Sequence, residues 1–185
     1  MKMLKKLLAV VLTGAMALTL FTACGSNAVS DKDIADALNN IVKLNNSEVT
    51  FTPQAKEREM ARKLAALVES MRPTATVADG GESSDNEFEK KYKEILGCNE
   101  GGANADNFVW VQQALADKLG AEGQAFQVME SLTDKGTAYN SSSLGNKEPA
   151  NDRCMGTALC KIPDQKGNLV TVRIIVVTAK AVDKK

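Results

Sequence analysis

The segment NLVTVRIIVVTAK, residues 168–180, constrains the fold of this chain more than any other stretch. Its apolar residues fall on both faces of a β-strand, with Val170, Val172, Ile174 and Val176 on one face and Ile175 and Val177 on the other. The second half of the strand is therefore expected to be covered on both sides. The preceding segment MGTALCKI, residues 155–162, is the predicted hairpin partner, because the intervening PDQKG is rich in turn residues.

A two-stranded hairpin alone is only marginally stable in water. It must therefore pack on helices, and we expect a third strand from EVTFT, residues 48–52, or TATVA, residues 74–78. The predicted fold class is α+β: about five helices followed by a C-terminal antiparallel hairpin in a small sheet.

Five amphipathic segments precede the hairpin, each with apolar residues at helical spacing. The first is expected to begin at Ser30, with Asp33 in capping-box position, and the second at Thr52-Pro53, ending at Arg72-Pro73. Their apolar stripes are Ile34, Leu38, Ile41 and Val42; Met60, Leu64, Leu67, Val68 and Met71; Phe88, Tyr92, Ile95 and Leu96; Phe108, Val111, Leu115 and Leu119; and Ala125, Val128, Met129 and Leu132. We expect the core to include Leu64, Leu67, Val68, Leu115, Val172 and Ile174.

The 21 residues 133–153 contain almost no apolar side chains. A loop of this length is uncommon in a compact domain and is usually functional or disordered. Tyr139 and Asn140, with the serines 141–143, have a composition suited to recognition, so they are the candidate binding residues. A tolerated surface insertion is the alternative.

The N-terminus has the pattern of an export signal. Three lysines within the first six residues precede 17 uncharged residues, 7–23, which are few for a spanning helix of roughly 20. The run ends in Thr22-Ala23-Cys24, which resembles the lipobox of bacterial lipoproteins. This resemblance implies that Cys24 is acylated, becomes the first residue of the mature chain and holds it at the extracytoplasmic face of the cell membrane. A cleaved secretory signal with an incidental cysteine, or an uncleaved anchor helix, are the alternatives.

The predicted organisation is a signal peptide at 1–23, a tether at 24–30 and one α+β domain at 31–182. Residues 1–23 hold three lysines and no acid, so the rest of the chain has a net charge of −3. Without a basic block, nucleic acid is not an expected partner. The expected partners are the membrane, through the lipid, and an envelope protein, glycan or peptide.

The chain has no histidine, which excludes Ser-His-Asp and Cys-His catalysis. The cysteines besides Cys24 are Cys98, Cys154 and Cys160, which allow at most one internal disulfide, joining Cys98 to one of the others. Neither a metal site nor a cofactor is expected, because histidine and C-x-x-C spacing are both lacking. Carboxylates could still act as acid and base, and the candidates are Glu100, Asp106 and Asp134.

The order of these elements resembles the CAP superfamily, the cysteine-rich secretory and antigen-five group. Residues 51–71 resemble the helix after its first turn, and residues 155–160 resemble the first strand of its hairpin. GCNEGGAN, residues 97–104, lies where that family has Gly-Glu-Asn, which places Glu100 on the family glutamate. AFQVMESLTDK, residues 125–135, resembles its Trp-x-x-Ser-x-x-His segment, with Ser131 on the serine and Asp134 in place of the histidine.

Both histidines of the family cleft are missing, and its tryptophan is Val128. The resemblance therefore implies a degenerate member with an α/β/α sandwich, without the cleft metal site, that binds rather than hydrolyses. We accordingly expect a membrane-anchored binding or interaction module. A carboxylate-dependent hydrolase of envelope glycan or peptide, using Glu100 and Asp134, and a purely structural envelope protein are the alternatives.

Overall fold

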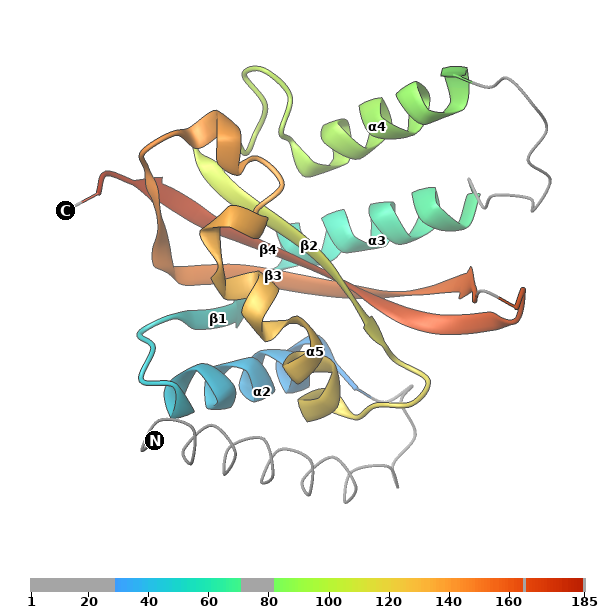
Figure 1. The fold of residues 1–185 in the computed structure, drawn as a ribbon, viewed down its shortest axis with the longest axis horizontal. Helices are drawn as coiled ribbons and strands as arrows, with labels where there is room; N and C mark the ends of the chain where they lie inside the picture. The colour runs from blue at the N-terminus through green and yellow to red at the C-terminus, as the bar shows by residue number, and fades with distance from the viewer. Residues whose placement is uncertain (1–28, 71–81, 165, 185) are drawn as a thin grey trace, which may run out of the picture.

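The computed structural model describes residues 29–70, 82–164 and 166–184 (Figure 1). In chain order its elements are α2 Asp31–Leu44, β1 Thr50–Pro53, α3 Ala55–Ser70, α4 Glu82–Leu96, β2 Asn107–Leu115, α5 Ala121–Thr133, the short 3-10 helices η2 Lys135–Thr137 and η3 Ser141–Leu144, β3 Glu148–Pro163 and β4 Leu169–Val182. These ranges contain a mixed α+β structure, as predicted. The predicted signal peptide and Cys24 lie outside the described residues.

The four strands form one mixed sheet in the order β1-β3-β4-β2. β3 and β4 are antiparallel and pair from Arg153 opposite Ala179 to Pro163 opposite Leu169, which confirms that these segments form a hairpin. β1 runs parallel to β3, and β2 runs antiparallel to β4. The hairpin is therefore the centre of a four-stranded sheet. Segment 48–52 contributes to it as β1, whereas 74–78 lies outside the described residues.

A pair of helices covers each face of the sheet (Figure 1). On β4, Val172, Ile174 and Val176 pack in the core cluster that α3 and α4 contribute to. Ile175 and Val177 point the other way and pack in the cluster under α2 and α5. The prediction that β4 is covered on both sides is confirmed.

The first two helices show how local signals set helix ends. Ser30 and Asp33 form the predicted capping box at the start of α2, satisfying backbone donors that would otherwise lack partners. α3 begins at Ala55 rather than at Pro53, because Thr52 and Pro53 belong to β1 and pair with β3. The stop predicted at residues 72–73 lies outside the described residues.

The predicted fourth helix is wrong. Residues 107–115 form strand β2, and the described ranges contain four α-helices. The apolar residues Phe108, Val109, Trp110 and Val111 are contiguous, and β-branched and aromatic side chains favour a pleated surface. Leu115, which was expected in the core, lies at the end of this strand and is 38% exposed. The other residues expected in the core are buried or, for Val68, partly buried: Leu64, Leu67, Val68, Val172 and Ile174.

Among the described residues, no helix has the length and apolar character needed to cross a membrane.

Candidate functional site

The segment after α5 lies along the outer edge of β2. The Tyr139 N–H donates to the carbonyl of Val109 at 2.7 Å. The side chain of Asn140 accepts from the Val109 N–H at 3.0 Å and donates to the carbonyl of Asn107 at 2.7 Å. Asn140 is only 7% exposed, and both polar atoms of its side chain form hydrogen bonds to the edge of the sheet. Its predicted role in ligand contact stays a prediction.

The expectation of a structureless loop over 133–153 is wrong. The segment contains η2 and η3, and β3 already begins at Glu148. Ala138 and Leu144 are buried in the core cluster under α2 and α5. Although its composition is polar, this segment is ordered and covers one edge of the sheet.

An aromatic row lies beside this edge. The ring centroids of Phe88 and Tyr92 on α4 are 5.8 Å apart, and those of Tyr92 and Tyr139 are 5.2 Å apart. The row thus joins both tyrosines of the chain, from segments 47 residues apart in sequence. Tyr139 is 38% exposed, so the row reaches the surface. We refer to Phe88, Tyr92 and Tyr139 as the aromatic surface.

The two phenols of this surface have raised pKa values. Burial raises the pKa of Tyr92 to about 12, with smaller contributions from Tyr139 and Cys98. The pKa of Tyr139 is also raised, mainly by burial. At neutral pH the two phenols can therefore present ring faces and hydrogen-bonding hydroxyls without charge, a combination suited to neutral polar ligands.

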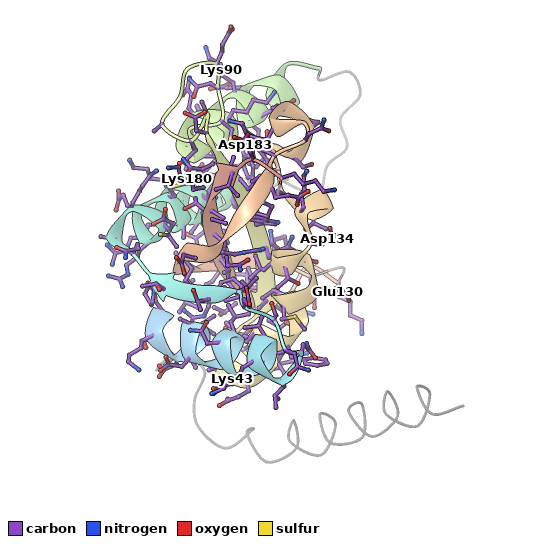
Figure 2. All side chains as sticks on the ribbon, turned by 90° about the vertical axis from the view of Figure 1, so that its left-hand side faces the viewer. Lys43, Lys90, Glu130, Asp134, Lys180 and Asp183 are labelled. Carbon is purple, nitrogen blue, oxygen red and sulfur yellow. The ribbon has the colours of Figure 1, made fainter. Side chains whose placement is uncertain are left out.

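Of the carboxylates predicted as acid and base, Glu100 and Asp106 lie in the connection between α4 and β2, and Asp134 follows α5. Glu100 is exposed on the turn between α4 and β2, and Asp106 is exposed just before β2. Asp134 caps η2, where its carboxylate accepts from the Gly136 N–H at 2.8 Å. Figure 2 shows Asp134 and Glu130 at the outer surface near the end of α5. Ser131 lies within α5, and its backbone carbonyl accepts from the Thr137 hydroxyl.

A shallow, open groove of about 440 Å³ lies between α3 and α4. Its described lining includes the apolar side chains of Leu67 and Ile95 and a single carboxylate, Glu94. The described residues that line the groove therefore do not include the facing pair of carboxylates that acid–base hydrolysis needs. None of Glu100, Ser131 and Asp134 lines it.

Among the described residues, no disulfide links Cys98, Cys154 and Cys160. Burial raises the pKa of the Cys98 thiol to about 11 and also raises that of Cys154. Cys160 is buried on β3, where its sulfur contacts the carbonyl of Ala65 at 3.7 Å. No group of three metal-ligating side chains occurs in the part of the chain that the structure describes.

The sequence pattern does not predict that two arginines, Arg153 and Arg173, are buried. Arg153 is 3% exposed, and its guanidinium donates to the carbonyls of Leu132 and Thr133 at the C-terminus of α5. The same group lies 4.5 Å from the centroid of the Trp110 ring. Burial lowers the pKa of Arg153 to about 10, so it remains a cation at neutral pH. The positive charge is stabilised by the partial negative charge at the C-terminus of α5 and by the π face of the Trp110 ring.

Arg173, also buried, connects several elements. It donates from Nε to Gln124 of α5 at 2.8 Å, from Nη1 to Thr157 of β3 at 2.9 Å and from Nη2 to the carbonyl of Val29 at 2.8 Å. Thr157 in turn donates to Asp31 at 2.6 Å. This network holds the N-terminal end of the domain against the sheet.

Comparisons with models of protein families, with curated proteins and with solved structures find no match to this chain.

Proposed function

We propose that the protein is a lipid-anchored module on the extracytoplasmic face of the cell membrane that binds a ligand of the cell envelope through its aromatic surface. The anchoring part rests on the signal-like pattern ending at Cys24. The observation that carries the binding part is the juxtaposition of the Tyr92 and Tyr139 rings, whose centroids are 5.2 Å apart, with Tyr139 exposed and Tyr92 partly buried.

The chemistry of this surface favours a neutral, polar ligand, a glycan strand before a peptide. An aromatic face buries the apolar side of a ring or chain, and the phenol hydroxyl offers a hydrogen bond at its rim. Lys93 and Glu89, two charged side chains that act on Tyr139, form an ion pair of 2.6 Å with each other. A strongly charged ligand would have to compete with that pair.

The proposal includes a relation to the CAP superfamily as a degenerate, non-catalytic member. In its support, helices cover both faces of the sheet, as the sandwich implied by the resemblance requires. Asp134 occupies the position at which the family has a histidine, and its carboxylate accepts a hydrogen bond from the Gly136 N–H in the following turn. Its carboxylate is thus committed to the local backbone, which favours binding over hydrolysis.

Binding of soluble cell-wall oligosaccharides, measured by calorimetry, tests the ligand-binding part. Tyr139→Ala should weaken binding by about tenfold or more, as truncation of an aromatic anchor commonly does. Leu44→Ala is the matched control, because Leu44 is 82% exposed at the far end of α2 and should leave affinity unchanged. Equal affinity of the two variants would contradict the assignment of this surface, and release of reducing ends by the wild type would favour the hydrolase instead.

Acyl labelling tests the anchoring part separately. Cys24→Ala should abolish incorporation of labelled fatty acid and move the protein out of the detergent phase. Equal detergent partitioning of the variant and the wild type would contradict a lipid anchor at this cysteine.

A further inference from the structure

The described chain starts at a point fixed on the domain. Val29 packs against the core cluster under α2 and α5, and its carbonyl accepts from buried Arg173 at 2.8 Å. Ser30 then caps α2, and Asp31 accepts from Thr157 at 2.6 Å and pairs with Arg58 at 2.5 Å. The position at which the chain leaves the domain toward Cys24 is therefore set by the interior of the fold.

Only five residue steps separate Cys24 from Val29. Even fully extended, they span roughly 18 Å, at about 3.6 Å for each residue. A domain of this length has a radius of gyration of about 15 Å and is thus more than twice as broad as the tether can reach. If Cys24 carries the anchor, the end of the domain with Val29 must lie next to the bilayer.

That end of the domain has an unusual share of exposed apolar side chains. In the sheet, Arg173 pairs with Leu159 of β3, and the adjacent Val172 pairs with Leu115 of β2. Leu169 begins the same strand, and Phe126 precedes Gln127, whose side chain accepts from the Leu115 N–H at 2.9 Å. We call Leu115, Phe126, Leu159 and Leu169 the apolar end; their exposed fractions run from 38% to 56%.

The other exposed large apolar side chains among the described residues are Leu44, Tyr139 and Val182. Leu44 is the last residue of α2 and Val182 the last of β4, both far along these elements from Val29. Figure 1 shows the β3–β4 turn and the end of β2 on the right and the C-terminus at the far left, with the start of α5 below the sheet near the start of α2. The apolar residues thus gather at the end to which the tether leads.

We propose that the apolar end rests in the interface of the bilayer and fixes the orientation of the domain on the membrane. This inference rests on the proposed lipid anchor. The aromatic surface contains Tyr139, which lies against Val109 near the start of β2, and β2 ends at Leu115. In this orientation the aromatic surface is directed away from the membrane, toward the ligand.

The contact depends on apolar burial rather than on charge. Near the apolar end, Lys118 is exposed beside Asp117, and Asp164 is held in the β3–β4 turn by Asn168. Because both signs are present, an excess of anionic lipid is not required. Vesicles of zwitterionic phosphatidylcholine should suffice.

Tryptophan quenching by brominated phosphatidylcholine measures this contact on the full-length, acylated protein in vesicles. The test variant is Leu169→Trp, and the matched control is Val182→Trp at the opposite end; the parent residues are 56% and 39% exposed. The native Trp110 is fully buried, so the parent protein supplies the background for both variants. Emission of Leu169→Trp should shift to the blue and be quenched several-fold more strongly than that of Val182→Trp.

Three results would overturn the inference. Equal quenching of the two variants, or stronger quenching of Val182→Trp, would show that the apolar end does not face the lipid. A blue shift without quenching would show that a second copy of the chain covers it. Mass spectrometry of the N-terminal peptide is run on the same preparation, so that an absent acyl group, which would refute the proposed anchor, is distinguished from an acylated domain oriented differently.

Discussion

Substitution of Gly156 by alanine tests the packing of α3 on the sheet. A Cβ atom built at Gly156 would lie 1.9 Å from the backbone nitrogen of Arg58 and 2.3 Å from the carbonyl carbon of Glu57. Ordinary contacts of a Cβ atom are 3.4–4 Å, so the first turn of α3 would have to withdraw by about 1.5 Å. Because the obstructing atoms are backbone, no side-chain rotation can relieve the contact.

The cost follows from what holds α3 in place. Its residues Met60, Ala61 and Leu64 are buried in one cluster with Val109, Val172 and Ile174, so a shift of the helix loosens that whole layer. Overpacking usually costs about 1–3 kcal/mol, and a backbone obstruction belongs at the upper end. Alanine also restricts the unfolded chain, which raises the unfolding free energy by about 0.4–1 kcal/mol. The net decrease in unfolding free energy is therefore about 2 kcal/mol.

Urea unfolding followed by circular dichroism, with the thiols kept reduced, measures the effect. A net loss of about 2 kcal/mol lowers the midpoint by about 1 M, given a denaturant dependence of about 2 kcal/mol per molar urea. Gly136→Ala is the control, since its Cβ would meet only side-chain atoms of Asp134, at 3.3 Å, which need to move by only a few tenths of an ångström. Coincident midpoints for the two variants would refute the reasoning that α3 lies directly on Gly156.

Three further outcomes are expected. Ile174→Ala, at a site 2% exposed, should lower the unfolding free energy by about 2–5 kcal/mol, whereas Leu44→Ala should not change it measurably in the same urea assay. Burial raises the pKa of Tyr92 from its ordinary 10.0 to about 12, so on raising the pH the unfolded chain loses this proton before the folded chain does. The unfolding free energy should therefore fall as the pH rises from about 10 to 12. Urea titrations at several pH values measure this fall, and Tyr92→Phe should make it smaller. Asn140→Ala should cost about 1–3 kcal/mol and promote concentration-dependent association, visible by light scattering, because it frees polar groups at the edge of β2; a monodisperse variant of wild-type stability would contradict this role.

The parts of the fold that could be predicted are those determined by short-range pattern. The two apolar faces of β4 require a covered central strand, and the structure places it between two helical layers. The capping box of Ser30 and Asp33 likewise depends on residues three apart. Such features need no knowledge of distant neighbours.

The predictions were wrong where contacts with residues distant in the sequence determine the local structure. Phe108, Val111 and Leu115 fit a helical spacing, but pairing with β4 makes the segment a strand. The two buried arginines could not be found from sequence, because arginine usually lies at the surface and is buried only when partners satisfy it. Those partners, such as the carbonyls of Leu132 and Thr133 for Arg153, come from elements remote in the chain.

The edges of the sheet explain why the segment after α5 is polar and yet ordered. An exposed edge strand offers unpaired N–H and carbonyl groups to other chains, so a stable monomer must cover them. At β1, Asn39 of α2 accepts from the Phe51 N–H at 2.7 Å and donates to the carbonyl of Phe51 at 2.9 Å. Asn140 likewise makes one accepted and one donated bond to β2, from the Val109 N–H and to the carbonyl of Asn107. An asparagine side chain has one acceptor and one donor group, as a strand residue has, and can replace a neighbouring strand over one residue. Polar composition in residues 133–153 therefore has a structural cause, and removal of that segment is expected to expose an edge rather than merely shorten a loop.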